Sequence, residues 1–269
     1  MADPPVSVFV GDVLAGRAAL VTGGGTGIGK EIARVLGAHG AQVALTSRRR
    51  EVLDAAAAEL SSEGIECHVD SCDVRDPAAV SRVVAGVVER FGRLDIVVNN
   101  AAGNFPAPIT RISPNGFKAV VDIDLLGTYH VSKAAFDAWL KDNGGCIVNI
   151  SAPFEHRGVA MQAHVAAAKS AVDSLTRTCA VEWGPHGIRV NGVAPGTIGG
   201  TEGLRRFSTV VRGGDDTPTN PLGLMGHGQD IAYCVLFLCT GSARFVSGQV
   251  IAVDGAGSVD QLKLGRLPE

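Results

Sequence analysis

Short apolar runs alternate with longer segments of helical period from residue 17 to residue 254. The runs are continuously hydrophobic, which is typical of strands buried on both faces of a parallel sheet. In the segments between them, apolar residues recur every three or four positions, which predicts helices. The expected strands cover 17–22, 41–47, 65–70, 94–100, 145–151, 187–194 and 249–254.

The expected helices follow these strands one by one, beginning with a helix that starts near Ile28 and an alanine-rich helix that ends at Leu60. Further helices are expected over 77–91, 114–140, 161–183 and 228–239. Regular alternation of strand and helix predicts an α/β fold, a single doubly wound Rossmann-type domain with a parallel sheet of about seven strands. No repeat or linker divides the chain, so residues 1–269 should form one domain.

Two segments fall outside this alternation. Residues 1–14 carry two prolines and no basic region, so we expect an extended N-terminal arm and not a signal peptide. Residues 197–227 are rich in glycine and aspartate and follow the sixth strand, beyond the sheet edge where doubly wound folds bind ligands. We expect this insertion to cover a substrate, the alternative being a structureless surface loop.

Composition and charge exclude several classes of function. The net charge is -3 and no apolar run reaches membrane-spanning length, so neither nucleic acid nor a membrane is an expected partner. The six cysteines form no CxxC pair and no cluster with metal-ligand spacing, so we expect no metal site. Without a signal peptide or a peroxisomal C-terminal tripeptide, the chain is expected to be cytoplasmic.

A glycine-rich run follows the first expected strand directly and opens the first helix. Gly23, Gly27 and Gly29 have the spacing TGxxxGxG, with Thr26 and Ile28 between them. Glycines let the backbone approach a pyrophosphate, and the helix N-terminus offers it free amides. The strand before and the helix after favour a phosphate-binding site over a plain turn.

The end of the second strand predicts the choice of cofactor. A carboxylate there would accept hydrogen bonds from a ribose 2′-hydroxyl and favour NAD. This chain has Ser47 followed by Arg48, Arg49 and Arg50 instead. A guanidinium suits a 2′-phosphate, and three positive charges at a helix start fit poorly as a merely solvated run. We therefore predict NADP(H).

Three further motifs follow in order: Cys72-Asp73-Val74, the NNAAG segment at 99–103, and Pro195-Gly196. With the glycine run, they resemble the short-chain dehydrogenase/reductase family over nearly the whole chain. That resemblance implies a homotetramer and a nicotinamide cofactor. The implied cofactor-binding residues are Gly23, Thr26, Gly27, Ile28, Gly29, Arg48, Asp73, Val74, Asn100, Ala101, Lys169, Pro195, Gly196 and Ile198.

Most of that family's catalytic positions carry other residues here. Lys169 is retained, but the asparagine, serine and tyrosine positions hold Asp124, Ala152 and Val165. A valine cannot donate a proton, so ordinary ketone reduction is disfavoured. Ser151 lies next to the serine position, and a shift of one residue along a strand turns a side chain to the opposite face.

The remaining polar residues suggest a different catalytic set. Lys169 and Asp173 are four residues apart on one helix face, and Asp124 could perturb the lysine's titration. We predict that Lys169, Asp124 and Asp173 are catalytic and hold a water that supplies a proton. Alternatively, Lys169 only binds the nicotinamide ribose while the aspartates balance its charge.

The pattern without tyrosine resembles the peroxisomal type of 2,4-dienoyl-CoA reductase. The matching segments are NAAGNF (100–105), DID (122–124), HRG (156–158), AKSAVD (168–173), VEWGP (181–185) and GTEGLRR (200–206). This resemblance implies NADPH-dependent reduction of 2,4-dienoyl-CoA to 3-enoyl-CoA in unsaturated fatty acid oxidation. The alternatives are reduction of 2-enoyl-CoA or another C=C bond, and a non-catalytic NADP-binding protein.

An acyl-CoA substrate fits the missing tyrosine because the carbonyl itself is never reduced. The resemblance implies that Asn104 and Phe105 border the acyl chain, and His164 stands beside the vacant tyrosine position. Arg205 and Arg206 could contact the CoA phosphates, the alternative being an exposed, solvated helix face.

Overall fold

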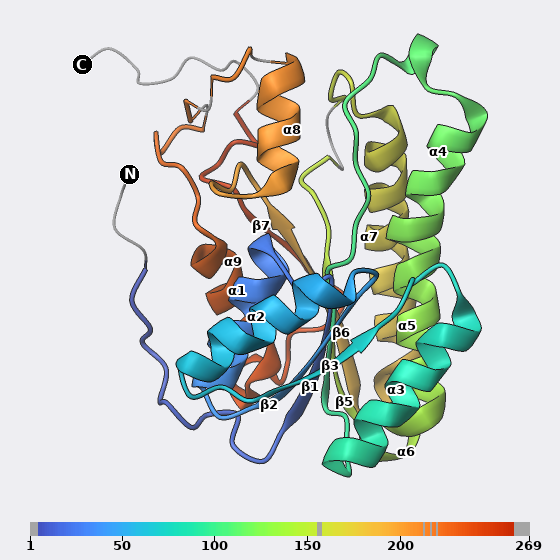
Figure 1. Ribbon diagram of the computed structural model, residues 1–269, viewed down its shortest axis with the longest axis vertical. Coiled ribbons are helices and arrows are strands. Elements are labelled where there is room, and N and C mark those ends of the chain that lie inside the picture. The colour runs from blue at the N-terminus through green and yellow to red at the C-terminus, as the bar shows by residue number, and fades with distance from the viewer. Residues whose placement is uncertain (1–4, 155–157, 212, 216, 219, 261–269) are drawn as a thin grey trace.

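The computed structural model describes residues 5–154, 158–211, 213–215, 217–218 and 220–260. A central seven-stranded parallel sheet has the order β3-β2-β1-β4-β5-β6-β7, as expected for a doubly wound domain (Figure 1). Its strands are β1 (Ala18–Thr22), β2 (Gln42–Ser47), β3 (Cys67–Ser71), β4 (Ile96–Asn99), β5 (Gly145–Ile150), β6 (Ile188–Pro195) and β7 (Val250–Val253). The expected fold class is confirmed.

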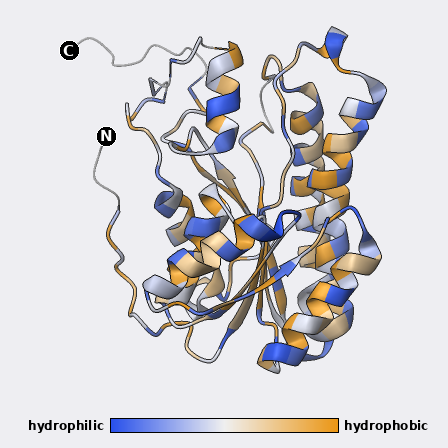
Figure 2. Ribbon diagram, in the orientation of Figure 1, coloured by the Kyte–Doolittle hydropathy of each residue, from blue (hydrophilic) through white to orange (hydrophobic). Residues whose placement is uncertain are grey.

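Helices cover both faces of the sheet because successive residues of each buried strand point to opposite sides. One face packs against α1 (Gly27–Ala38), α2 (Arg50–Ser62) and α9 (Gly228–Cys239). The other packs against α3 (Pro77–Phe91), α5 (Gly127–Ala135) and α7 (Ala163–Trp183). Figure 2 shows hydrophobic and hydrophilic residues interleaved along these helices, as expected for helices with one apolar face.

The segment expected as one helix over 114–140 is more complex. It comprises α4 (Pro114–Val121), a π-helical turn η2 (Asp122–Leu126), α5, a second π turn η3 (Phe136–Leu140) and the short α6 (Lys141–Asn143). In a π turn each backbone hydrogen bond spans five residues and not the four of an α-helix. The side chains that follow are therefore rotated around the helix axis. Regular helical period cannot reveal this shift, which sets the direction of Asp124 within η2.

Buried amides connect the middle of the sheet to two of its covering helices. The Asn99 Nδ2 donates to Ser132 Oγ (2.9 Å) and to Asn149 Oδ1 (2.8 Å). The Asn149 Nδ2 in turn donates to Thr176 Oγ1 (2.8 Å). These bonds join β4 and β5 to α5 and α7 in the interior, where an unpaired amide would be costly.

The insertion 197–227 is partly ordered by backbone bonds at its two ends. Ile198 and Gly226 form an isolated parallel bridge, and Gly199 N–H donates to the Gly226 carbonyl (2.8 Å). Between these ends lies α8 (Glu202–Val211), which stands above the carboxyl edge of the sheet (Figure 1). The alternative of a loop without structure does not hold for its described part.

The N-terminal arm runs extended along α1 and α9 (Figure 1). Ser7 Oγ bonds His39 Nε2 at 2.8 Å, and the rings of Phe9 and Tyr233 meet His39 edge-on. Residues 1–4 of the expected arm lie outside the described residues.

Candidate active site

A groove at the carboxyl edge of the sheet contains most of the expected cofactor-binding residues. Its volume is about 350 Å³. Ten of the expected residues line it, namely Gly23, Thr26, Gly27, Ile28, Gly29, Arg48, Asp73, Val74, Asn100 and Ala101. Thr201 and Glu202 from the insertion also line the groove, which sequence reasoning missed because that segment has no clear period.

The start of this groove can be built only from glycines. A Cβ on Gly29 would lie 2.4 Å from the Gly23 carbonyl oxygen and 2.4 Å from Asn100 Nδ2. Gly23 itself has a φ of 64°, in the left-handed region. Asn100 Nδ2 donates to the carbonyls of Thr22 and Gly23, which holds the turn open. The chain therefore presents a backbone cradle that fits a dinucleotide pyrophosphate.

The three consecutive arginines after β2 differ in where their side chains lie. Arg48 and Arg49 line the groove, whereas Arg50 Nε donates to Asp54 Oδ1 (2.8 Å) on the outer side of α2. The hydrogen bond from the Arg75 guanidinium lowers the pKa of the Asp73 carboxyl, which lies across the groove. Two arginines thus remain available for an anionic group.

A buried aspartate–lysine pair lies where the catalytic groups were expected. Lys169 Nζ donates to the Ile150 carbonyl (2.7 Å) and lies 3.5 Å from Asp124 Oδ2. Asp124 Oδ1 accepts from Gly103 N–H (2.7 Å). Asp173 follows one turn later on α7 and is also buried. The fold therefore brings Asp124 and Lys169 into contact.

Burial dominates the protonation of the Asp124 carboxyl. Loss of solvent raises its pKa above the ordinary value, against the opposing effects of the Lys169 charge and the Gly103 N–H. An ion pair in a dry environment repays desolvation only in part. Asp124 therefore holds a proton more readily than an exposed carboxyl does.

The positions that usually donate to a carbonyl are apolar here. Val165 packs in a small cluster with Val120, Ala168 and Phe154. Ser151, beside the expected serine position, is buried, and its Oγ has no hydrogen-bond partner in the described structure. Neither tyrosine lies with this cluster: Tyr129 is half exposed on α5, and Tyr233 contacts His39.

The expected substrate residues come from three segments. Phe105, in the loop after β4, packs edge-on against His164 on α7, with ring centroids 4.4 Å apart. Arg206 on α8 reaches back to the Asn104 carbonyl (3.4 Å) and pairs with Glu202, while Arg205 points to solvent. His156 and Arg157 of the HRG motif lie outside the described residues.

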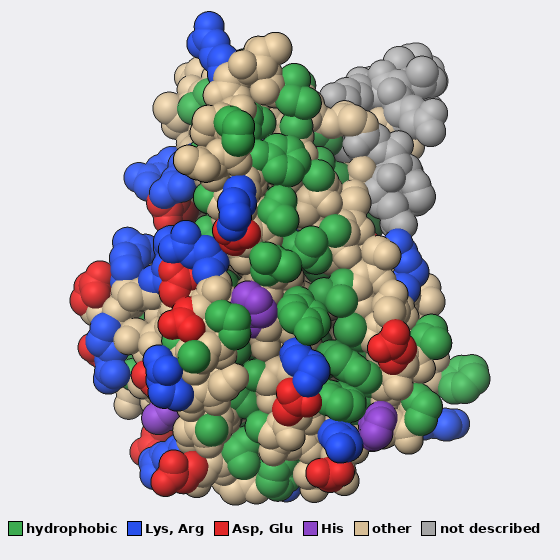
Figure 3. All heavy atoms as spheres, turned by 90° about the vertical axis from the view of Figure 1, so that its right-hand side faces the viewer, with side chains coloured by type: hydrophobic (Ala, Val, Ile, Leu, Met, Phe, Trp, Pro, Cys, Tyr) green, Lys and Arg blue, Asp and Glu red, His purple; other side chains and the backbone are tan. Residues whose placement is uncertain are grey.

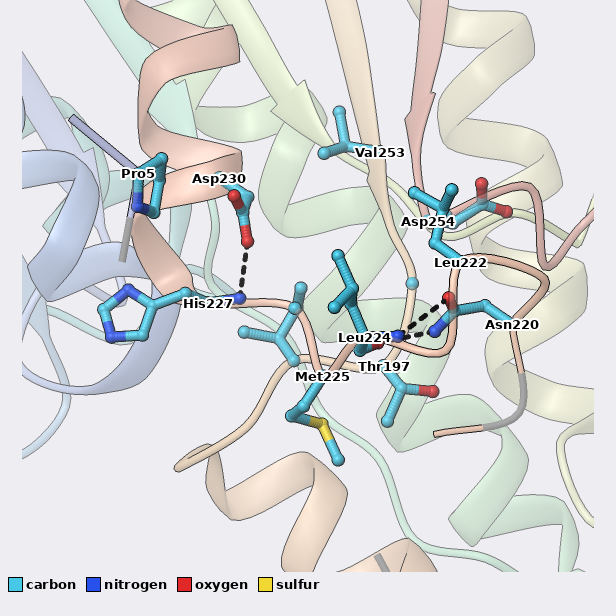
Figure 4. Close-up of a pocket in the computed structure, with 14 residues that line it drawn as sticks. Pro5, Thr197, Asn220, Leu222, Leu224, Met225, His227, Asp230, Val253 and Asp254 are labelled. Atoms are coloured by element: carbon cyan, nitrogen blue, oxygen red, sulfur yellow. Dashed lines mark hydrogen bonds between the residues drawn. The ribbon is translucent and has the colours of Figure 1, made fainter. Parts of the chain in front are cut away.

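The remaining expected cofactor residues do not line the groove. Gly196 and Ile198 border a second cavity of about 250 Å³, and Pro195 ends β6 (Figure 4). Around this cavity Asn220 Nδ2 donates to the Leu224 carbonyl and His227 N–H to Asp230 Oδ2. The sequence motif alone did not reveal that the segment after β6 borders a separate space.

Neither a metal site nor a membrane span is found among the described residues. No group of three or more His, Cys, Asp or Glu side chains could hold a metal ion there. Within the same residues no helix is both long and apolar enough to cross a bilayer.

The buried Asp124 carboxyl predicts a specific pH dependence of stability. Its pKa is higher in the folded protein than in the unfolded chain, so its contribution to stability is full below the unfolded pKa and is lost as the pH rises through the folded pKa. We expect the Asp124→Asn variant to lack this loss of stability with rising pH. Thermal unfolding measured from acidic to neutral pH tests the expectation. Asp137→Asn, at an exposed ion pair, is the control. Identical pH profiles of wild type and Asp124→Asn would contradict the argument.

Similarity to known proteins agrees with this geometry. The family model described as enoyl-(acyl carrier protein) reductase matches residues 23–257. A peroxisomal 2,4-dienoyl-CoA reductase of Danio rerio, named as (3E)-enoyl-CoA-producing, is 45% identical over 255 residues, covering 92% of this chain and 83% of that protein. A probable 2,4-dienoyl-CoA reductase of Bacillus subtilis, named as (2E)-enoyl-CoA-producing, is 38% identical over 242 residues, covering 89% and 95%.

The fold is also similar to that of a solved structure. The citronellol catabolism dehydrogenase of Pseudomonas aeruginosa has a TM-score of 0.84 and 37% identity, covering 94% of this chain and 99% of that one.

The expectation of a cytoplasmic location is wrong. Relatives from Danio rerio, Rattus norvegicus, Arabidopsis thaliana and Saccharomyces cerevisiae are named peroxisomal enzymes, which contradicts it. Short address signals are read by receptors and leave no trace in composition or fold, so the missing tripeptide was a weak basis. By its motifs, its fold and its relatives, the chain belongs to the short-chain dehydrogenase/reductase family.

Proposed function

We propose that this protein is an NADPH-dependent 2,4-dienoyl-CoA reductase that forms a 3-enoyl-CoA in unsaturated fatty acid oxidation. The buried Asp124–Lys169 pair, next to a position that holds Val165 in place of a hydroxyl donor, carries the proposal. The names of relatives up to 45% identical support it.

A conjugated dienoyl thioester needs the chemistry that this site retains. When bound, the nicotinamide cofactor supplies a hydride, which adds at the far end of the diene. Negative charge then gathers on the thioester oxygen, and a carbon atom takes the proton. Because no carbonyl is converted to an alcohol, a phenol at position 165 is dispensable.

Asp124 and Lys169 hold the proton that the carbon receives. The raised pKa of the Asp124 carboxyl favours a proton on it or on a water that it binds through Oδ2, which has no other hydrogen-bond partner in the described structure. Lys169, whose Nζ donates to the Ile150 carbonyl, lies beside this carboxyl, and Asp173 follows one turn later on α7.

The acyl-CoA would enter between the loop after β4 and the insertion 197–227, with α8 covering it. Asn104 and Phe105 border the acyl chain in this proposal. The exposed Arg205 and Arg206 provide charge-assisted hydrogen bonds to CoA phosphates. The contact of Arg206 with the Asn104 carbonyl supports the placement of α8 over the site.

NADP(H) is the proposed cofactor, because Arg48 and Arg49 line the adenosine end of the groove and no carboxylate follows β2 directly. Pro195, Gly196 and Ile198 would bind the nicotinamide end only if the segment after β6 also faces the groove in the complex.

A homotetramer is the proposed assembly. Figure 3 shows hydrophobic side chains gathered on the face formed by the helices on this side of the sheet. Among the exposed apolar residues of the helices on one side of the sheet, Leu126 and Tyr129 are at least 40% exposed, and Val181 on α7 is 78% exposed. Apolar area of this kind on paired helices is typical of an interface between copies of a chain.

The main test follows NADPH oxidation with a 2,4-dienoyl-CoA and with the matching 2-enoyl-CoA. We expect turnover of the dienoyl thioester only, with a product whose double bond is not conjugated to the thioester. A conjugated product would indicate the (2E)-enoyl outcome instead. Turnover of the 2-enoyl-CoA would favour another C=C reductase, and NADPH binding without turnover of either would favour a non-catalytic protein.

Lys169→Ala should lower kcat/KM in the same assay by roughly 10²–10⁴-fold, as loss of a positioned acid–base group does. Val165→Tyr should not raise it. Lys141→Ala, at an exposed lysine of α6, is the control. Full activity of Lys169→Ala would refute the mechanism.

Arg48→Ala should weaken NADPH binding by about 10–100-fold, because a charge-assisted bond to phosphate is lost. NADH binding should change little, since it lacks the 2′-phosphate. Fluorescence titration measures both. Arg50→Ala is the matched control, as Arg50 is paired with Asp54. Equal losses for the two cofactors would contradict the assignment of NADP(H).

The double variant Tyr129→Glu, Val181→Glu should dissociate the tetramer, because two charges would be buried in an apolar interface. Light scattering gives the mass of each form. A wild-type protein that is monomeric at working concentration would end the proposal of an assembly.

A further inference from the structure

His164 is a buried imidazole that has no partner. It lies in the first turn of α7 and is fully buried. Neither Nδ1 nor Nε2 has a partner in good hydrogen-bond geometry in the described structure, and only the Phe105 backbone approaches the ring closely enough to affect its pKa as a hydrogen-bond partner would. Buried polar groups in proteins are nearly always hydrogen-bonded, so an exception at this place indicates a group that awaits a ligand.

Other buried side-chain oxygens also lack a hydrogen-bond partner in the described structure, four of them on or next to elements that hold Asp124, Lys169 or the groups that bond them. These four are Asp124 Oδ2, Ser151 Oγ, Asn104 Oδ1 and Gln162 Oε1. They come from η2, which holds Asp124, from the N-cap of α7, and from the loop after β4 and the end of β5, where Gly103 and Ile150 bond the pair. An apolar core does not contain such a set, whereas a closed site for a polar substrate group does.

Phe105 is one of the side chains that pack against His164. The ring of Phe105 packs edge-on against the imidazole, and it is itself 37% exposed. Because Phe105 is partly exposed, its side chain has room to rotate away from His164 when a ligand binds. The acyl thioester would then meet His164 at the place that Phe105 leaves.

Burial, against the effect of the nearby Asp124 charge, favours the neutral form of His164. Burial lowers its pKa from the ordinary value, against smaller opposing effects of the Phe105 backbone and the Asp124 carboxyl. The charged group that acts on it is Asp124 from η2, whereas Lys169 and Asp173 follow further along α7. The loop over 100–106 contributes none. A neutral imidazole offers one N–H donor and one acceptor.

We propose that the neutral His164 donates its N–H to the thioester oxygen of the acyl-CoA and stabilises the negative charge that develops there. This role rests on the proposed reductase function. His164, which directly precedes Val165 at the tyrosine position, would then supply the hydrogen-bond donor that the absent tyrosine cannot. No covalent bond to His164 forms or breaks: the hydrogen bond strengthens as the oxygen gains charge, and the proton for carbon comes from the water held by Asp124 and Lys169.

The test compares two buried histidines that differ in their partners. His164→Phe removes the donor but keeps a ring against Phe105. We expect kcat/KM with a 2,4-dienoyl-CoA to fall by about 10²–10³-fold, as when one oxyanion donor is removed. The unfolding temperature should stay equal or rise, because unpaired buried nitrogens are lost. NADPH affinity should not change. His164→Gln keeps an N–H and should retain activity within about tenfold of wild type.

His39→Phe is the matched control. His39 is also buried, but its ring bonds the Val35 carbonyl (2.7 Å) and Ser7 Oγ (2.8 Å). Its replacement should lower the unfolding temperature and leave kcat/KM unchanged. If His164→Phe behaves in this way, His164 only packs against Phe105 and the proposal is wrong.

The pH profile separates a donor from an acid. With a neutral donor, the ratio of wild-type to His164→Phe activity should stay constant as the pH rises above neutrality. A ratio that falls tenfold with each pH unit would make the imidazolium the proton source and overturn the proposal. If the wild type binds NADPH but does not reduce any dienoyl-CoA, the proposed function itself fails, independently of the two variants.

Discussion

The contact between Asp124 and Lys169 is the interaction on which the rest of this site depends. Two charged groups without solvent are stable only when their other atoms are also satisfied. Gly103 N–H provides this for one carboxyl oxygen and the Ile150 carbonyl for the ammonium. The loop after β4, the end of β5, the π turn η2 and α7 must therefore all meet at one point. Displacing any of them would leave a charge unpaired in the interior.

The amide network below this pair serves the same requirement. Asn99 and Asn149 occupy facing positions on β4 and β5 and bond outward to α5 and α7. Directional bonds of this kind fix the height and rotation of a helix, which apolar packing alone leaves adjustable. The distance between Asp124 and Lys169 is thus set by polar contacts deeper in the domain.

The sequence was sufficient for the parts of the fold that follow from apolar patterning. Continuous hydrophobic runs marked the seven strands, and the glycine run marked the cofactor groove because only glycine fits there. The π turn η2 escaped prediction since it changes the hydrogen-bond ladder without changing which residues are apolar. The meeting of Asp124 with Lys169 was expected from family resemblance, whereas the unpaired state of His164 depends on every neighbouring atom and cannot be read from spacing.

The bridge between Ile198 and Gly226 also has a consequence for how such a protein can diversify. The two ends of the insertion are tied together at the base, so the chain enters and leaves the segment at nearly one place. Thr201 and Glu202 of the insertion line the cofactor groove, but changes of length or composition beyond them need not disturb the sheet. The middle of the segment can therefore vary while the scaffold beneath it keeps its sequence.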